Sequence, residues 1–359
     1  MPELAIAGRR IGHPPLASLR LASTQSVVAV FRRKNASGIV IMNNKSLSLC
    51  YEDLSDRLDS YTLPVNLTIP KFVAEIGCNH GGKLGVAKQM IVVAKTCGAD
   101  VAKFQKRSPR ELLTSEQYHA PYDNPHSFGR TYGEHREALE FDASTHRLLK
   151  ACCEEHGIEY STSVWDVTSA CEIISLKPNS IKVPSACNNN IEMLELLRDE
   201  YDGDVHISTG MTTREEIDRA IAVFHACPER IVLYACTSAY PAGSKDVCLL
   251  EIVRLVRHYK QTDLVREIGF SGHHNGIALD AIAPLLGATI IERHFTLDRT
   301  SKGSDHAASL EPAGFARITR NARQIAEAWT LKSTDILPVE VPQRNKLKYR
   351  SRFPLVKEA

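Results

Sequence analysis

From residue 71 onward, the sequence places chemically capable side chains at or near the ends of short apolar runs. The candidates with charged or imidazole side chains are Glu75, Lys103, Lys182, His273, His294 and Asp305. Lys103 and Lys182 can hold an anion, and a carboxylate can transfer protons or bind hydroxyl groups. His273 and His294 come from neighbouring runs and could bind one divalent metal, with water or substrate at its remaining positions.

A second group of candidates carries hydroxyl or amide groups at the ends of the same runs. Its members are Gln105, Thr162, Ser185, Ser208, Ser238, Tyr240 and Ser271. Serine hydroxyls can donate hydrogen bonds to phosphate or carboxylate oxygens. One such residue alone usually caps a helix, but polar groups at every end together indicate a site. The residue types favour a small phosphorylated anion, a metal and a polar, uncharged partner.

The apolar runs that must position these groups alternate with helical patterns. Strands are predicted at Phe72–Ile76, Asp100–Gln105, Glu159–Ser163, Ser180–Val183, Val205–Ser208, Ile231–Ala235, Glu267–Ser271 and Thr289–Glu292. Helices are predicted at Leu84–Thr96, Ala143–Glu155, Thr213–His225, Leu249–Tyr259 and Glu311–Thr330. Eight such units predict a closed (β/α)8 barrel. An open, doubly wound sheet is the alternative, but the residues after the first strand do not match its glycine-rich phosphate loop.

The predicted barrel explains why the charged residues indicate function. A barrel interior is normally filled with Val, Ile and Leu, and active sites lie at the carboxyl ends of the strands. Two lysines and a glutamate in that interior would be costly unless they pair with each other or with a ligand. We therefore expect Glu75, Lys103 and Lys182 to meet in one functional site.

Outside the barrel, the sequence predicts two flanking segments and one long loop. Residues 1–70 form an extension with a β-hairpin, from strands at Ser26–Phe31 and Gly38–Met42, and a short helix at Tyr51–Ser60. The barrel covers residues 71–335, and residues 336–359 form a basic tail. The loop from Arg107 to Glu140 is long enough to act as a lid over a site.

Composition narrows the class of protein further. The chain has 359 residues, of which 43% are hydrophobic, and its net charge of +2 gives no reason to expect a nucleic-acid partner. Its 10 cysteines are scattered without a C-x-x-C pair, which is typical of free thiols in a reducing compartment. We find no signal peptide and no run near the roughly 20 apolar residues of a membrane span. We expect a cytoplasmic protein without a membrane partner.

Several ordered motifs resemble the sialic acid synthase family. They are Glu75–His80, Lys103–Gln105, Ser208–Met211, Cys236–Pro241, Gly272–His273, Glu292–His294 and Lys302–His306. The resemblance implies a (β/α)8 barrel enzyme that condenses phosphoenolpyruvate with an aldose, such as N-acetylmannosamine or a related hexose. The product would be a 2-keto-3-deoxy sugar acid, and phosphate would be released. It also implies a divalent metal, foremost Mn²⁺ with Mg²⁺ or Co²⁺ as alternatives, and a homodimer.

The resemblance also implies roles for the candidate residues. Glu75, Lys103, Lys182 and Asp305 would be catalytic, and His273 and His294 would bind the metal. Phosphoenolpyruvate would be bound by Lys103, Thr162, Lys182, Ser185, Ser208, Ser238 and Ser271. The sugar would face Glu75, Gln105, Tyr240 and Asp305.

Two departures from the family pattern bear on the substrate. The family usually carries a C-terminal antifreeze-like domain, whereas here only the start of its linker is matched, at residues 340–347. This departure favours a different or unacylated aldose, or a lid supplied separately. Cys187 stands where the family commonly has an acidic residue, and a packed thiol is expected there rather than a reactive one.

Two other functions are compatible with the same residues. An aldolase could use Lys103 or Lys182 as a Schiff base, which would require a lysine of lowered pKa in a dry pocket. A non-catalytic barrel could bind sugar as a sensor or scaffold, but it would be expected to lack the catalytic residues that this chain retains.

Overall fold

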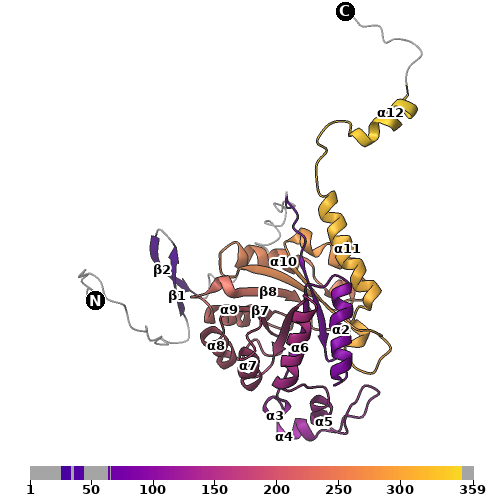
Figure 1. The fold of residues 1–359 in the computed structure, drawn as a ribbon. Helices are drawn as coiled ribbons and strands as arrows, with labels where there is room; N and C mark the ends of the chain where they lie inside the picture. The colour runs from indigo at the N-terminus through magenta and orange to yellow at the C-terminus, as the bar shows by residue number, and fades with distance from the viewer. Residues whose placement is uncertain (1–25, 34–35, 44–63, 65, 350–359) are drawn as a thin grey trace, which may run out of the picture. The chain divides into compact units, whose positions relative to one another are not determined.

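The computed structural model describes residues 26–33, 36–43, 64 and 66–349, and the chain divides into two compact units at residues 62 and 63. In the first unit, β1 (Ser26–Arg33) pairs antiparallel with β2 (Ala36–Asn43), which confirms the predicted hairpin (Figure 1). The helix predicted at Tyr51–Ser60 lies outside the described residues.

The second unit contains a closed barrel of eight parallel strands in the order β10-β3-β4-β5-β6-β7-β8-β9. These strands are β3 (Lys71–Gly77), β4 (Val101–Lys106), β5 (Glu159–Val164), β6 (Ser180–Val183), β7 (Asp204–Ser208), β8 (Ile231–Cys236), β9 (Glu267–Gly272) and β10 (Ile290–His294). All eight predicted strands are present within two residues of their expected bounds. The closed order confirms the predicted (β/α)8 barrel and excludes the open sheet.

Helices flank the strands of the barrel (Figure 1). They are α2 (Leu84–Thr96), α6 (Ala143–Glu155), α7 (Val167–Ile174), α8 (Ile191–Glu200), α9 (Arg214–Val223), α10 (Leu250–Leu255) and α11 (Pro312–Ala328). A π-helical segment, Val256–Lys260, continues α10, and two 3₁₀ turns, Leu279–Ala281 and Ala283–Leu286, connect β9 with β10. The loop after β4 holds three short helices, α3 (Pro109–Leu112), α4 (Ser115–His119) and α5 (Tyr132–Glu137). A final short helix is α12 (Val341–Leu347).

The strands sort their side chains into two layers, because alternate residues of a strand point to opposite faces. Outward residues such as Phe104 and Ile181 belong to the large core between the strands and the helices. Inward residues form a separate, small apolar cluster of Val73, Val101, Val232, Tyr234 and Ile290. Two residues further along several of these strands, the inward positions are charged. The barrel interior therefore has an apolar floor beneath a charged layer at the carboxyl ends of the strands.

Buried histidines contribute to the packing outside the barrel. The His80 ring stacks on Phe141 with 4.2 Å between centroids, and His146 Nδ1 lies 2.8 Å from Tyr160 Oη. Burial lowers the pKa of His80 to about 4 and that of His146 to about 3. Both imidazoles are therefore neutral in the folded protein at neutral pH.

These neutral histidines make the fold sensitive to mild acid. Their pKa values are lower in the folded chain than the usual 6.5, so the free energy of unfolding falls progressively as pH drops below 6.5, down to about pH 4 for His80 and about pH 3 for His146. Each one changes the unfolding free energy by up to about 1.4 kcal/mol per pH unit. His146→Gln should reduce the slope of urea-unfolding free energy between pH 6.5 and 4. His225→Gln, at an exposed site, is the control, and equal slopes in the wild type and His146→Gln would contradict the assignment.

No helix in the ranges the structure describes combines the length and apolar character needed to cross a bilayer.

Candidate active site

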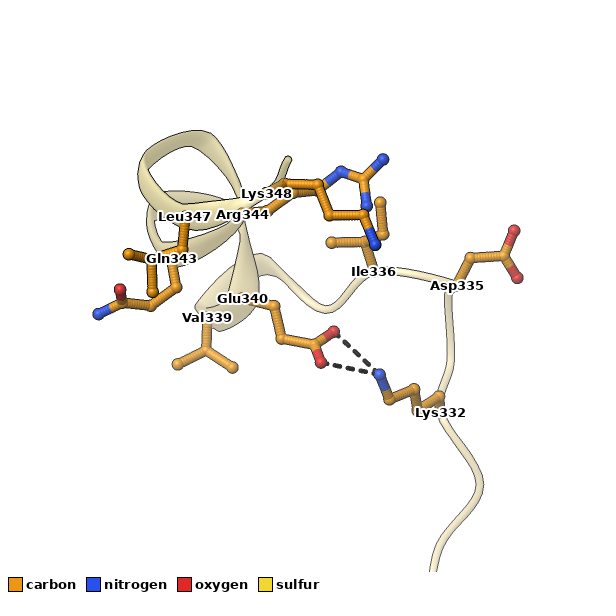
Figure 2. Close-up of a pocket in the computed structure, with 9 residues that line it drawn as sticks. All are labelled: Lys332, Asp335, Ile336, Val339, Glu340, Gln343, Arg344, Leu347 and Lys348. Carbon is orange, nitrogen blue, oxygen red and sulfur yellow. Dashed lines mark hydrogen bonds and ion pairs between the residues drawn. The ribbon is translucent and has the colours of Figure 1, made fainter. Parts of the chain in front are cut away.

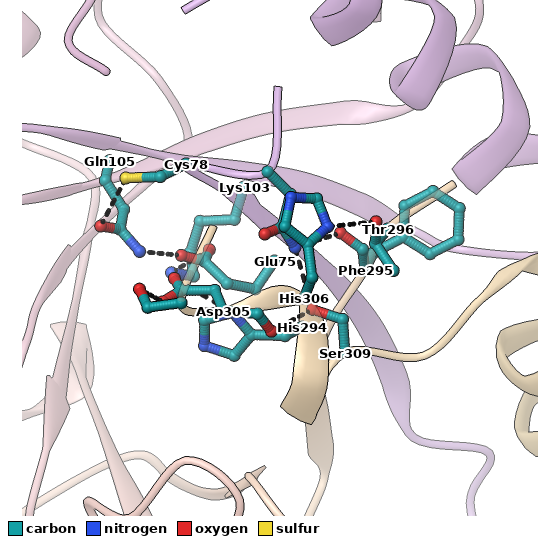
Figure 3. A network of polar contacts seen from close by, with 12 residues as sticks. Glu75, Cys78, Lys103, Gln105, His294, Phe295, Thr296, Asp305, His306 and Ser309 are labelled. Carbon is teal, nitrogen blue, oxygen red and sulfur yellow. Dashed lines mark hydrogen bonds and ion pairs between the residues drawn. The ribbon is translucent and has the colours of Figure 1, made fainter. Parts of the chain in front are cut away.

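Four buried charged side chains meet in the barrel interior. Lys103 from β4 forms an ion pair with Glu75 of the adjacent β3 and lies 3.5 Å from Glu292 Oε1 of β10. Lys182 from β6 donates to the same Glu292 oxygen at 2.8 Å. Gln105, two residues beyond Lys103, donates to Glu75 Oε1 at 2.7 Å (Figure 3). The interior lysines are thus paired with carboxylates, one of the two conditions, pairing or a ligand, under which their burial was expected.

Burial and mutual attraction set the protonation of this cluster. Burial raises the pKa of Glu75, and the Lys103 ammonium only partly offsets that effect. Burial also opposes the ionisation of Glu292, but the two ammonium groups outweigh it and lower its pKa to about 2. Lys103 keeps a raised pKa because two carboxylates flank it, whereas burial lowers the pKa of Lys182. Glu292 is thus the fixed anion, and Glu75 is the carboxyl group that can most readily hold a proton.

Glu292 is the member of this cluster to which the sequence assigned no role. In the sequence it stood only as the last residue of the predicted strand Thr289–Glu292 and within the motif Glu292–His294. The available signal was its spacing, since it lies two residues before His294 and therefore on the same strand face. The need of two interior lysines for a second counter-charge pointed the same way.

Hydroxyl groups line the other side of the interior. The Ser185 and Ser238 hydroxyls lie 3.0 Å apart, although one follows β6 and the other follows β8. Gly210, after β7, permits this approach, because a Cβ there would lie 2.3 Å from Ser238 Oγ. Ser271 donates to Glu292 Oε1 at 3.3 Å, and Ser208 is buried at the end of β7. Of these four predicted serines, Ser271 thus contacts the charged cluster directly, and Ser185 and Ser238 contact each other.

Thr162 is not brought to this site, which corrects the sequence-based expectation. In the sheet it pairs with Phe104 and Ile181, two outward residues of the core between strands and helices. The next residue, Ser163, pairs with Gln105 and Lys182 and therefore faces the interior. The hydroxyl at this strand end belongs to Ser163, which accepts from Trp165 Nε1 at 3.3 Å.

The two predicted metal-binding histidines lie side by side at the mouth of the barrel. The ring centroids of His273 and His294 are 5.3 Å apart, and the Tyr240 ring packs 4.2 Å from that of His273. Asp305 Oδ2 lies 3.7 Å from His294 Nδ1 (Figure 3). Burial would raise the pKa of Asp305, but His294 and Arg107 lower it below its usual value.

The two imidazoles suit a metal with an open coordination sphere. His273 Nδ1 lies 2.8 Å from the Thr237 carbonyl oxygen, which can only accept, so the proton sits on Nδ1 and Nε2 is free. His294 Nδ1 is buried without a hydrogen-bond partner. Among the described residues, no three His, Cys, Asp or Glu side chains are grouped to hold a metal. The two histidines therefore fit a metal ion with two protein ligands, whose remaining coordination positions would be filled by water or substrate.

The long loop after β4 reaches the segment that carries Asp305. Gly303 N donates to His126 Nδ1 at 3.2 Å, and Lys302 Nζ lies 4.9 Å from the centroid of the Phe128 ring. At its base, Arg107 Nε donates to Glu140 Oε1 at 2.6 Å, which joins the two ends of the loop. The loop is thus built from short helices and contacts the second loop at the mouth.

Cys187 has a packed thiol, as expected. It belongs to the core between strands and helices, and burial raises its pKa to about 12. A thiol in this state is not a ready nucleophile at neutral pH.

A separate hollow lies in the C-terminal segment, lined by residues 332–348 (Figure 2). Lys332 Nζ lies 2.8 Å and 3.0 Å from the two carboxylate oxygens of Glu340 across it. Its lining residues come from beyond α11, so none of the strand-end groups belongs to it. The candidate site residues therefore lie in the barrel and not in this hollow.

The closed barrel and its polar strand ends place the chain in the class of (β/α)8 barrel proteins. Within that class it belongs to the NeuB family, whose family model matches residues 90–333.

Relatives and solved structures agree with this family. The chain is 39% identical over 275 residues to the human N-acetylneuraminate-9-phosphate synthase, covering 77% of this chain and 75% of the relative. It is 32% identical over 260 residues to an N,N'-diacetyllegionaminic acid synthase of Campylobacter jejuni, covering 71% and 76%. The crystal structure of an N-acetylneuraminic acid synthetase from Leptospira borgpetersenii, in complex with citrate, matches with a TM-score of 0.64 at 25% identity, covering 91% and 99%. The resemblance to sialic acid synthases is thereby confirmed.

Proposed function

We propose that the chain is a nonulosonic acid synthase that condenses phosphoenolpyruvate with an aldose. The names of its relatives support a sugar acid product of the sialic type. The observation that carries the proposal is the pair of buried ammonium groups, Lys103 and Lys182, in the same barrel interior as the hydroxyls of the strand-end serines. Such a site suits a compact substrate with two anionic groups, one carboxylate and one phosphate.

In the proposed reaction, C3 of phosphoenolpyruvate attacks the aldehyde carbon of the open-chain sugar. Water adds at C2, and phosphate leaves with cleavage of its C–O bond, so the sugar acid and inorganic phosphate account for all atoms. Lys103 and Lys182 would hold the two anionic groups of phosphoenolpyruvate, and Ser185, Ser238 and Ser271 would donate to their oxygens. Because its pKa is raised, Glu75 is suited to hold a proton and pass it to the aldehyde oxygen.

His273 and His294 would hold a divalent metal, foremost Mn²⁺, with Mg²⁺ or Co²⁺ as alternatives. When bound, such an ion polarises the aldehyde oxygen as a Lewis acid. Gln105, Tyr240 and Asp305 would then face the sugar and orient its hydroxyls at the mouth of the barrel.

The acceptor is expected to be a hexose, because three carbons from phosphoenolpyruvate and six from the sugar make a nine-carbon acid. C9 of the product then comes from C6 of the hexose. The name of the human relative specifies a 9-phosphate product, so 6-phosphorylated hexoses belong among the substrates tested.

Phosphate release tests the proposal directly. The protein would be assayed with phosphoenolpyruvate and Mn²⁺ or EDTA against N-acetylmannosamine, its 6-phosphate, mannose, mannose 6-phosphate, arabinose 5-phosphate and 2,4-diacetamido hexoses. Metal-dependent release with one sugar, together with a new 2-keto acid, is the expected result. If no sugar gives release and phosphoenolpyruvate does not bind, the synthase function is wrong.

The lowered pKa of Lys182 is the one observation that favours the Schiff-base alternative. Against it, the Lys182 ammonium is ion-paired with Glu292 at 2.8 Å, which keeps its proton and removes its nucleophilic lone pair. Borohydride treatment with pyruvate should leave the mass of the protein unchanged. A covalent adduct on either interior lysine would replace the synthase by an aldolase.

The contact between the two mouth loops should matter for the sugar rather than for phosphoenolpyruvate. Phe128→Ala removes the ring beneath Lys302 and should raise the sugar KM about tenfold, while the phosphoenolpyruvate KM stays within about twofold. Arg110→Ala is the matched control, since it removes a similar cation–π contact with Tyr118 in the same loop, at a residue 75% exposed. Equal changes in both KM values would argue against a role for this loop over the sugar.

A further inference from the structure

A tyrosine lies beneath the Lys182 ammonium in the barrel interior. Lys182 Nζ sits 4.1 Å from the centroid of the Tyr234 ring, within the range of a cation–π interaction. Tyr234 is fully buried, on β8. In the sequence, Tyr234 stands within the apolar strand predicted at Ile231–Ala235, and it has no part in the proposed reaction.

Two neighbouring residues define where that ring lies. Tyr234 Oη is 3.0 Å from Nδ1 of His206, the inward residue that pairs with Lys182 across β6 and β7. Burial lowers the pKa of His206 to about 3, so its imidazole is neutral. On the other side, Gly269 of β9 leaves room for the ring, because a Cβ there would lie 2.6 Å from Tyr234 Cε1. The ring is thus held between a hydrogen bond and a glycine.

Lysine needs such support more than arginine would. Its side chain is a flexible four-carbon stem that ends in a compact charge, so its position depends on what surrounds it. Glu292 accepts from Lys182 and also attracts Lys103, so Glu292 alone would draw both ammonium groups together. The Tyr234 face lies beneath Lys182 alone, and it can hold that ammonium apart from Lys103.

We propose that Tyr234 and His206 are positioning residues for the phosphoenolpyruvate-binding Lys182: the ring face fixes the ammonium, and the His206 hydrogen bond fixes the ring. The proposal rests on the proposed function, in which Lys182 holds one anionic group of that substrate. It adds two interior residues that contact neither the substrate nor the metal in the mechanism above.

Substitutions of Tyr234 separate the ring from its hydroxyl. Tyr234→Leu removes the ring face and should raise the phosphoenolpyruvate Kd and KM about tenfold to thirtyfold, while the sugar KM stays within about twofold. Tyr234→Phe keeps the face and should recover most of that loss. His206→Val removes the hydrogen bond and should match Tyr234→Phe within about twofold. Binding would be measured by isothermal titration with phosphoenolpyruvate, and KM by phosphate release.

A purely structural tyrosine would behave differently. It would reduce the folded fraction and hence the apparent kcat, but the folded molecules would keep the wild-type KM for phosphoenolpyruvate. Tyr259→Leu supplies this comparison, since Tyr259 is also buried and donates from its hydroxyl to Asp218 at 2.8 Å, outside the barrel interior. It should lower stability and leave both KM values unchanged.

The outcomes are distinct. If the wild-type protein does not bind phosphoenolpyruvate, the proposed function and this inference both fail. If the wild type binds it and Tyr234→Leu binds it equally well, only the inference is wrong. Should Tyr234→Leu not fold, Gly269→Ala decides by the same measurements, because it displaces the ring while it keeps every side chain of the site.

Discussion

Lys103→Met should reduce phosphate release from phosphoenolpyruvate by about a thousandfold or more. Methionine keeps much of the side-chain length but removes the charge, so Glu75 loses its ion-pair partner and Glu292 keeps only Lys182. Breaking a buried pair on one side should also lower the free energy of unfolding by about 3 kcal/mol. Phosphate release and urea unfolding at pH 7 measure the two effects.

A double substitution separates chemistry from charge balance. Glu75→Gln together with Lys103→Met removes both members of the pair, so it should recover most of the lost stability without recovering activity. Lys71→Met is the surface control, since Lys71 pairs with Glu159 at 2.6 Å but its side chain is 44% exposed. It should change stability by less than about 1 kcal/mol. Activity within tenfold of the wild type in Lys103→Met would contradict the role of this lysine.

His294→Gln should strongly weaken the binding of Mn²⁺ and, with it, the activity that depends on the metal. His294 Nδ1 is buried without a hydrogen-bond partner, the ring of His294 lies 5.3 Å from that of His273 between centroids, and a glutamine cannot supply the same imidazole nitrogen. We expect the affinity for Mn²⁺ to fall about a hundredfold or more. Electron paramagnetic resonance of free Mn²⁺ during a titration measures this without reference to activity, and EDTA should remove activity from the wild type.

His146→Gln is the matched control for the loss of a buried imidazole, because His146 lies outside the barrel interior against Tyr160. It should bind Mn²⁺ as the wild type does, despite its altered response to acid. Unchanged Mn²⁺ affinity in His294→Gln, together with phosphate release that persists in EDTA, would show that these histidines serve another purpose.

The sequence predicted the barrel, and the strand face on which several candidate residues lie, because strand periodicity is strict. Lys103 and Gln105 lie two apart, so they had to share a face, and both face the interior as expected. At β5 the same reasoning could not decide which hydroxyl faces the interior, because Ser161, Thr162 and Ser163 all carry one. Only the register against Gln105 and Lys182 distinguishes Ser163 from Thr162, and register is a property of the closed barrel.

Other features depended on contacts that a single sequence does not display. The loop from Arg107 to Glu140 was expected as a lid, and its short helices carry capping boxes at Thr114 and Thr131 whose pattern is visible in the sequence. Its contact with residues 302 and 303 is tertiary and could not be foreseen. Nothing in the sequence distinguishes Tyr234 from the other residues of its strand, and its position under Lys182 is visible only in the structure.

The closure of the barrel has a consequence for how the protein is made. Glu292 and His294 lie on β10, which pairs with β3 near the opposite end of the barrel sequence. Until that last pairing forms, Lys103 and Lys182 lack the carboxylate that they share. During synthesis, a chain that has emerged only as far as β9 therefore holds two interior lysines but only one of their carboxylates, Glu75, so Lys182 cannot yet be buried with a counter-charge. The incomplete barrel therefore pays a cost if it buries Lys182. The pairing of β10 with β3 closes the barrel and completes the charged cluster in the same step. That step comes late and is slow, because it joins segments far apart in the sequence.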